Sequence, residues 1–596
     1  MTLPTWFIGP WELSRATAHL PPDPRAGRIL LIESTDKGRA LPWHRWKLVL
    51  VLSALRHFVE ELRAEGYEVD HRVATSYAEG IRAHIAEYGP SEVLVQEPAE
   101  WGIGESIRSA FRPEGLPRAG SRSALPKALG RVPGSAKLSS RDSAAGVDPS
   151  SVVRILPDRR FITSRDAFYR WAEGRKLFRM EDFYRWQRKR LGILVDGDGK
   201  PQGGTWNLDK ENRQGARALA KHGLPPEPIA FEPDEITRRV MRLVTRMGTA
   251  EYRVEGSRAE GGKAADRQGG PTGPSEANGH WGSVDGFNLP VTRAQALAAL
   301  DDFLTHRFRD FGPYEDAMLA GKTYLYHSRL SAAMNVGLLH PREMIDAAIR
   351  CWEESQAAGR KALGAESPIP YASLEGFVRQ ILGWREYING IYWLNIPEYR
   401  DSNYFGFERP LWQLYWEPEQ TDLACLRDSV TMVRDTAYAH HIHRLMVLSN
   451  FANLTGVNPL RLSEWFWAGF ADAMEWVELP NVVGMATFGD GGLLASKPYI
   501  SAAAYIDRMS NYCGGCRYNP KARTGENACP FNYLYWTFLD HVARKKFDVG
   551  QRMALALKLA ADIPAEEMKA MRAARKQFIE SLEPDATGWR FHYDQG

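Results

Sequence analysis

Cysteine is scarce in this sequence, with five among 596 residues. An export signal is lacking as well, because the first residues, MTLPTWFIGPWELS, contain no basic region followed by a long apolar stretch. Structural disulfides belong mainly to exported proteins. We therefore expect a cytoplasmic protein without structural disulfides.

Long apolar runs and an excess of charge of one sign are also missing. No stretch approaches the roughly 18 apolar residues of a membrane span, so we expect no contact with a membrane. The formal net charge of +3 is nearly balanced, and global charge therefore does not indicate a nucleic-acid partner. The arginine-rich stretch 165–190 is a local exception. Two interpretations fit it about equally well. One is a pair of amphipathic helices with a solvated charged face, and the other is a basic surface that binds a partner.

Three of the five cysteines are crowded near the C-terminus. Cys513, Cys516 and Cys529 form a C-x2-C-x12-C array, which Pro530 follows at once. Because a disulfide is not expected, the array predicts a zinc ion or an iron–sulfur cluster. The residues alone leave these two alternatives equally open. Cys351 stands apart and fits a buried free thiol.

The first part of the chain alternates between strand and helix patterns. Short apolar strands are predicted at 6–9, 28–34, 67–73, 91–98 and 152–158, with helices at 47–66 and 78–88. Such an alternation predicts a doubly wound parallel sheet. From about residue 290 onward, helical patterns dominate.

These patterns divide the chain into three parts. We predict an α/β domain over 1–160 with a low-complexity insertion at 113–150, interdomain helices and a flexible linker over 161–285 with low complexity at 255–283, and an α-helical domain over 286–596. The expected architecture is an α/β domain joined to a larger all-α domain.

Four segments of the helical part carry chemistry when they are read together. They are HSRLS (327–331), GFVRQILGWREYING (376–390), YAHHIHRLM (438–446) and WFWAGFADAMEWVELPN (465–481). The hydroxyls of HSRLS suit a pyrophosphate, although an ordinary helix cap explains them too.

The last two segments contain the groups that can transfer or hold protons. His440, His441 and His443 can exchange protons near neutral pH or simply lie on a helix surface. Metal binding is less expected, because adjacent histidines project about 100° apart on a helix. A buried Asp472 needs a partner, and Arg444 is the candidate.

Together these segments resemble the photolyase/cryptochrome family, most closely its bacterial iron–sulfur branch of (6-4) photolyases. The resemblance covers most of the chain outside the two low-complexity segments. It implies an FAD-binding helical domain that repairs (6-4) photoproducts in UV-damaged DNA under blue light, and we expect a monomer. In relatives the loop 195–213 lies beside DNA.

The resemblance also assigns roles in the helical domain. The residues implied for FAD are Tyr314, Ser328, Leu330, Ser331, Gln380, Arg385, Arg444, Asp472 and Glu478. His441 matches the histidine that protonates the lesion, with His440 beside it, and Trp384 matches a position near the lesion cavity. Glu478 stands where many relatives have Asn, and Leu445 where many eukaryotic relatives have a second histidine.

The remaining implied groups are a cluster, an antenna and an electron route. Cys425 matches a fourth ligand, so that Cys425, Cys513, Cys516 and Cys529 would hold a [4Fe-4S] cluster. A ribolumazine antenna would bind the first domain, with Glu33 as a contact. Trp465 and Tyr505 are candidates for electron hopping, which core packing explains equally well.

Three other functions remain open at this point. The runner-up is a cryptochrome-type photoreceptor that uses the same flavin pocket without repair. A cyclobutane-dimer photolyase is disfavoured by the pair of histidines. An iron–sulfur protein that binds nucleic acid, such as a primase-like module, would contain a cluster but no flavin, so a flavin spectrum would exclude it.

Overall fold

The N-terminal part of the molecule is built on one parallel sheet. The computed structural model describes residues 2–111, 152–175, 177–247, 279–359 and 368–586. The strands are β1 (Thr5–Ile8), β2 (Arg28–Ser34), β3 (Glu68–Ala74), β4 (Val93–Gln96) and β5 (Val153–Leu156), in the order β3-β2-β1-β4-β5. All four neighbouring pairs are parallel, which confirms the doubly wound sheet.

Helices cover this sheet and lead into the rest of the molecule. Around the strands lie α1 (Thr35–Arg39), α2 (Arg45–Ala64), α3 (Tyr77–Tyr88) and α4 (Trp101–Ala110), and α8 (Glu235–Arg246) packs on α2. A ring nitrogen of His44 accepts a hydrogen bond from the Trp46 backbone and so caps α2. The predicted insertion at 113–150 lies outside the described residues.

The arginine-rich stretch forms the helix pair that its pattern indicates. It contains α5 (Arg165–Ala172) and α6 (Met180–Leu191), and α7 (Ala216–His222) follows. Phe168 and Phe183 are buried on the inner sides of α5 and α6. The predicted linker at 255–283 lies outside the described residues up to position 278. Trp281 belongs to its end, and its indole donates a hydrogen bond to the carbonyl of Trp416.

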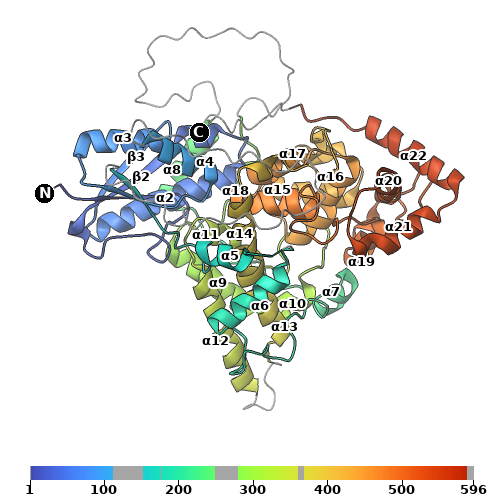
Figure 1. Cartoon of the computed structure of the whole chain (residues 1–596), viewed down its shortest axis with the longest axis horizontal. Coiled ribbons are helices and arrows are strands. Elements are labelled where there is room, and N and C mark those ends of the chain that lie inside the picture. Colours follow the sequence, from blue (N-terminus) through green and yellow to red (C-terminus); the bar gives the residue numbers. More distant parts are fainter. Residues whose placement is uncertain (1, 112–151, 176, 248–278, 360–367, 587–596) are drawn as a thin grey trace, which may run out of the picture.

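The remainder of the chain is helical, as predicted (Figure 1). Its helices are α9 (Arg293–His306), α10 (Phe308–Tyr314), α11 (Ser331–Asn335), α12 (Pro341–Gly359), α13 (Tyr371–Val378), α14 (Glu386–Asn395), α15 (Ala424–Thr436), α16 (Asn450–Thr455), α17 (Pro459–Gly469), α18 (Glu475–Glu478), α19 (Ala503–Met509), α20 (Pro530–Lys545), α21 (Ala554–Ala561) and α22 (Ala565–Glu580). Three π-helical segments interrupt the α-helices: η2 (Arg379–Arg385), η6 (His443–Ser449) and η7 (Leu479–Ala486).

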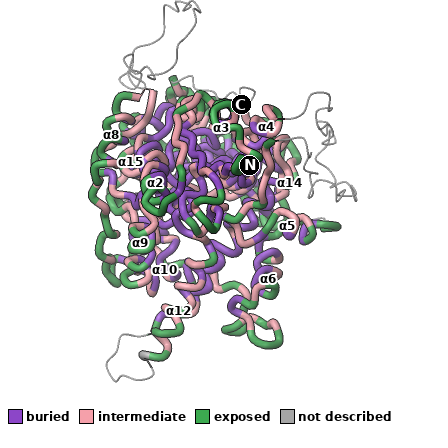
Figure 2. The backbone as a smooth tube through the Cα atoms, turned by 90° about the vertical axis from the view of Figure 1, so that its left-hand side faces the viewer, coloured by how far each residue is buried: buried purple, intermediate pink, exposed green. Residues whose placement is uncertain are grey.

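The α/β and helical parts share one buried core (Figure 2). The amine of Lys47 on α2 donates hydrogen bonds to the carbonyls of Trp467 and Ala473, both at 2.6 Å. The His44 ring reaches the carbonyl of Arg434 at 2.8 Å. These contacts join the first domain to α15, to α17 and to the segment that follows α17. In the described part of the chain, the helices are all too short or too polar to cross a bilayer.

Candidate functional site

The π-helical segments surround a cavity of about 540 Å³ in the helical part. Each of η2, η6 and η7 contributes side chains to its wall. A π-helical turn inserts one extra residue into an α-helix and is frequent at functional sites. Of the residues predicted to bind FAD, eight line this cavity: Ser328, Leu330, Ser331, Gln380, Arg385, Arg444, Asp472 and Glu478.

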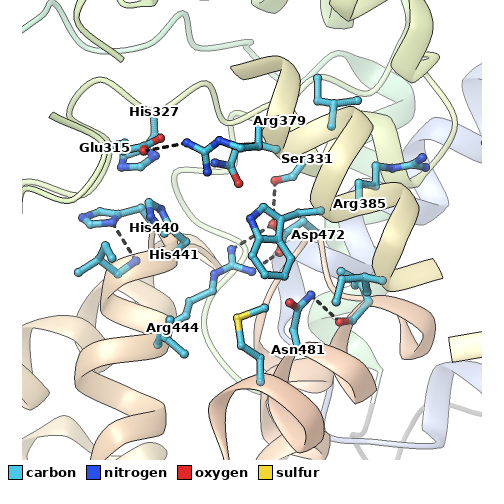
Figure 3. A pocket seen from close by; sticks show the side chains of 18 of the residues that line it. Glu315, His327, Ser331, Arg379, Arg385, His440, His441, Arg444, Asp472 and Asn481 are labelled. Carbon is cyan, nitrogen blue, oxygen red and sulfur yellow. Dashed lines mark hydrogen bonds and ion pairs between the residues drawn. The ribbon is translucent and has the colours of Figure 1, made fainter. Parts of the chain in front are cut away.

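Asp472 anchors one wall of the cavity (Figure 3). Its carboxylate accepts hydrogen bonds from both terminal nitrogens of Arg444, at 3.1 and 3.0 Å, and from the Ser331 hydroxyl at 2.7 Å. Burial opposes ionisation of Asp472, but Arg444 and Ser331 outweigh it and hold its pKa below the usual value. The predicted Arg444–Asp472 pair is therefore present. Because it is ionised and hydrogen-bonded, it forms a fixed polar feature in an apolar wall.

Glu478 and Arg385 are further buried ionisable residues of the wall. Burial raises the pKa of Glu478 to about 7, although Arg444 partly offsets the effect. Burial also lowers the pKa of Arg385 to about 10, against the attraction of Glu386. The Arg385 guanidinium lies over the ring of Phe161 at 4.1 Å. Because these groups are ionisable and buried, the binding of a ligand in the cavity depends on the charge of that ligand.

The two predicted catalytic histidines have contrasting surroundings. The His440 side chain is buried, and its pKa is well below the usual value because of burial and neighbouring histidines. His441 is 51 % exposed, and its Nε2 lies 3.3 Å from a carboxylate oxygen of Asp316. Although desolvation lowers the pKa of His441, Asp316 and Glu315 raise it above the usual value. The cavity wall thus combines a neutral His440 with a His441 that favours the protonated form.

The sequence prediction missed three residues of the same wall. His327 stacks on His440 with ring centroids 4.4 Å apart. Arg379 on η2 is buried and lies near Glu315, at 3.8 Å. Asp316 follows directly after Glu315. His327 stands within the HSRLS motif, from which only the hydroxyls were predicted to bind a ligand. Arg379 directly precedes the predicted Gln380.

Two predicted residues differ in their relation to the cavity. Trp384 lines it, as expected for a position near the lesion. Tyr314 is not among its lining residues and instead stacks against Tyr326 and His222, with centroids 5.5 and 5.0 Å apart. Tyr314 ends α10, and its ring points into a small separate core. Its assignment to FAD remains a prediction without support from the geometry.

The four predicted cluster ligands converge from three elements. Cys425 lies on α15, Cys513 in the short helix η8 (Tyr512–Gly515), Cys516 just after it, and Cys529 caps α20. Burial raises the pKa of the Cys425 thiol, and the other three cysteines raise it further, which requires them to be close. Cys351 lies apart from them, half-buried on α12.

A second cavity, of about 680 Å³, lies where the first domain meets α17. Glu33 lines it, and Arg56 donates hydrogen bonds to both of its carboxylate oxygens at 2.8 and 2.9 Å. Burial opposes ionisation, yet Arg56 and His71 lower the pKa of Glu33 to about 2. Trp467 lines this cavity, whereas the preceding Phe466 lines the first.

The two residues proposed for electron hopping lie in different places. Trp465 is buried on α17 with its ring centroid 6.1 Å from Trp281, and Trp281 lies 5.3 Å from Trp416. These rings form a continuous series that the sequence did not predict beyond Trp465. Tyr505 lies on α19 under the guanidinium of Arg508, at 5.4 Å.

Comparison with known proteins gives a consistent result. Residues 7–119 and 133–253 match the family described as deoxyribodipyrimidine photo-lyase-related protein. The chain is 37 % identical to the (6-4) photolyase of Agrobacterium fabrum over 567 residues, which cover 94 % of this chain and 96 % of that protein. It is also 39 % identical over 96 residues to the uncharacterized protein R855 of Acanthamoeba polyphaga mimivirus, covering 16 % of this chain and 71 % of that one.

A solved structure is similar over nearly the same span. A class III photolyase from Agrobacterium tumefaciens covers 97 % of this chain and 98 % of its own at 13 % identity and a TM-score of 0.47, an overlap too loose to add to the sequence relationship. The identity to the Agrobacterium fabrum protein spans almost the whole of both chains. This chain therefore belongs to the photolyase/cryptochrome family, in the group of deoxyribodipyrimidine photolyase-related proteins.

Proposed function

We propose that this protein repairs (6-4) photoproducts in DNA under blue light and that FAD is its catalytic cofactor. The observation that carries the proposal is the 37 % identity to a (6-4) photolyase over 94 % of this chain and 96 % of that protein. The domain division at 1–160, 161–285 and 286–596 belongs to the same proposal. UV-damaged DNA would be the partner of a monomer.

The first cavity fits a flavin dinucleotide by its chemistry. Buried nitrogens of Arg379 and Arg385 and the amide oxygen of Asn335 have no hydrogen-bond partner within the described residues, and all three side chains line the cavity. Buried polar atoms of this kind are normally satisfied, so they favour a polar ligand. Ser328, Ser331, Arg385, Arg444 and Asp472 are the residues that would hold FAD. When bound and reduced, FAD supplies the light-driven electron.

The histidines would supply and position the proton. His441 is held toward its protonated form by Asp316, and it lines the cavity together with Trp384. We assign His441 as the general acid. His440 stays neutral because it is buried, so it supports the ring of His441 without competing for the proton. The cavity also receives Asp209 and Arg213 from the loop 195–213, which would face the DNA.

The four cysteines would hold a [4Fe-4S] cluster. Four cysteine thiolates are the ligand set that such a cluster requires, and a tetrahedral zinc ion accepts the same set. The resemblance to the iron–sulfur branch of the family supports the cluster. We propose a structural role that joins α15 to the start of α20.

The second cavity would hold the ribolumazine antenna. Charged groups line it beside aromatic ones, and the indole nitrogen of Trp11 is buried there without a hydrogen-bond partner in the described structure. Phe466 and Asp472 face the first cavity, whereas Trp467 and Ala473 face the second. One segment of chain thus separates the two cavities, which suits energy transfer between their contents.

The test is a repair assay on the full-length protein. The protein would be reduced anaerobically, mixed with a (6-4)-damaged oligonucleotide and exposed to blue light, beside His441→Ala and a matched His541→Ala control from α20. We expect light to restore the damaged bases in the wild type and the control. The repair rate should fall roughly 100-fold or more in His441→Ala alone, as expected for loss of a general acid. Flavin and DNA binding without repair would indicate a photoreceptor instead, and a protein without flavin would overturn both readings.

A further inference from the structure

Three histidines converge in the wall of the first cavity. His327, His440 and His441 each offer a ring nitrogen, and these nitrogens all lie within 4.8 Å of one another. His327 comes from the loop before α11, whereas His440 and His441 come from the stretch before η6 (Figure 3). In the part of the chain that the structure describes, no other three histidine, cysteine or carboxylate residues converge so closely.

We propose that this three-histidine cluster binds a divalent transition-metal ion of the zinc, cobalt or nickel class. Imidazole nitrogens suit these ions, whereas magnesium and calcium prefer oxygen ligands. The sequence argued against a metal here, because adjacent helical histidines diverge. That argument fails because His440 lies before the helical residues, which begin at His441, and because His327 supplies a ligand from another segment.

Two of the ring nitrogens lack any other partner among the described residues. Nε2 of His327 and Nε2 of His440 are both buried without a hydrogen bond. The two residues are 7 % and 1 % exposed, so neither nitrogen is paired by solvent at the surface. An unpaired buried polar atom costs free energy, and a metal ion would satisfy both at once.

Outer contacts already orient two of the three rings. The His327 ring has a hydrogen bond to the backbone of Glu315, and Nε2 of His441 lies 3.3 Å from Asp316. Histidines that bind metals usually donate their other ring N–H to a carbonyl or carboxylate in this way. The carboxylate of Asp316 also supplies negative charge close to the ion.

His440 is the ligand that must adjust. Its ring stacks on that of His327 at an interplanar angle of 13°, so the two rings do not yet converge on a point between them. Its Nδ1 accepts a long contact of 3.4 Å from the Ile442 backbone. Rotation of this ring, with its proton moved to Nδ1, would turn Nε2 toward the ion at the expense of that long contact and of the present ring contacts with His327 and His443.

Binding would be measured by titrating Zn²⁺ into the full-length protein with its other cofactors in place. His327→Phe keeps an aromatic ring on His440 but removes one ligand, and His541→Phe on α20 is the matched control outside the cluster. We expect His327→Phe to bind at least about tenfold more weakly and the control to bind like the wild type. Equal affinity in His327→Phe, or no saturable binding to the wild type, would overturn the proposal.

A second variant covers the case in which His327→Phe does not fold. Asp316→Asn keeps all three ligands and removes the carboxylate beside His441, so we expect Zn²⁺ affinity to fall about 10- to 100-fold. Unchanged affinity in a folded Asp316→Asn protein would count against a site that includes His441.

The consequence for repair rests on the proposed function. An ion bound to His441 would block the general acid, so saturating Zn²⁺ should abolish repair and a chelator should restore it. Repair by the His327→Phe variant should not be inhibited by Zn²⁺, whatever the variant's rate without the ion. Zinc binding in a protein without any repair would reject the proposed function and leave the metal site standing. Repair that continues at full zinc occupancy would reject this inhibitory role.

Discussion

At the scale of single residues, carboxylates decide how the two adjacent histidines differ. His440 and His441 are neighbours in sequence, yet only His441 lies within ion-pair distance of Asp316. Burial keeps His440 neutral, whereas Asp316 and Glu315 raise the pKa of His441. A pair of titratable groups pushed apart in this way can divide the roles of proton donor and structural support.

Replacing Asp316 tests this division. In Asp316→Asn the pKa of His441 should fall, because its main stabilising charge is lost while desolvation remains. The protonated donor is lost as pH rises through this pKa, so the variant should lose repair at lower pH than the wild type. Rates would be compared from about pH 6 to about pH 8, a range that spans the ordinary pKa of histidine.

A control is available in another Asp–His pair. Asp310 lies 3.1 Å from His222, away from the three histidines, so Asp310→Asn should leave the pH dependence of repair unchanged. If the repair rates of Asp316→Asn and the wild type fall at the same pH, His441 does not donate the proton.

Glu478 gives a prediction about stability. Its pKa is raised from 4.5 to about 7 by burial, so the ionised form disfavours the folded state. The stability present below pH 4.5 is lost as pH rises through about 7. Glu478→Gln should therefore raise the free energy of unfolding by less than about 1 kcal/mol near pH 5 and by up to about 3 kcal/mol near pH 8.5, at about 1.4 kcal/mol per pKa unit.

Denaturant unfolding at both pH values measures this difference. Glu61→Gln, at an exposed position of α2, is the matched control and should show no gain at either pH. A gain from Glu478→Gln that is equal at the two pH values would contradict the assignment of a neutral carboxyl to Glu478.

Sequence patterns predicted some of these residues better than others. The Arg444–Asp472 pair was predicted because a buried carboxylate needs a cation nearby, and the hydrogen bonds at 3.0 and 3.1 Å are present. The approach of His327 to His440 could not be predicted, since these residues are more than a hundred positions apart and no local pattern links them. Tyr314 was assigned to the cavity by resemblance, but its ring packs against Tyr326.

At the scale of elements, strands were easier to predict than π-helical turns. The run RILLIES predicted β2 over its observed bounds, because a short apolar run between polar residues is typical of a buried strand in a parallel sheet. The segments η2, η6 and η7 share no sequence pattern that separates a π-helical turn from an α-helix. Their extra residue per turn depends on packing around the cavity rather than on local propensity, so the shape of the site was not predictable.

The cluster cysteines join elements that are distant in sequence. Tyr512 in η8 donates a hydrogen bond to Asp428 on α15 at 2.6 Å and lies 2.9 Å from His443. The same two elements carry Cys425 and Cys513, two of the four ligands of the proposed cluster. Loss of the proposed cluster should therefore loosen α15 against η8.

Cys516→Ala tests this dependence. We expect the variant to lose the visible absorption of the proposed cluster and to unfold its C-terminal region, since metal-site binding energy contributes to folding. Circular dichroism and limited proteolysis would measure the loss, with Cys351→Ala as a matched control because that thiol lies outside the array. A Cys516→Ala protein that stays folded but cannot repair DNA would contradict a structural role.

At the scale of the whole molecule, the interface between the two domains also forms the wall between the two cavities. Lys47 reaches across from α2 to Trp467 and Ala473, whose side chains line the second cavity. Phe466 and Asp472, next to them in sequence, line the first. Loss of the Lys47 hydrogen bonds would therefore affect both cavities.

Lys47→Met tests the interface with a side chain of similar length. It removes the amine that donates to the carbonyls of Trp467 and Ala473, and a lost hydrogen bond of this kind costs about 1 kcal/mol. Burial lowers the pKa of Lys47 to about 7, so the stability present above its ordinary pKa of 10.5 is lost as pH falls toward 7. We therefore expect Lys47→Met to be more destabilising near pH 9 than near pH 6, measured by thermal unfolding, whereas the exposed Lys558→Met should have no effect. A loss as small as that of Lys558→Met at both pH values would show that Lys47 does not hold the two domains together.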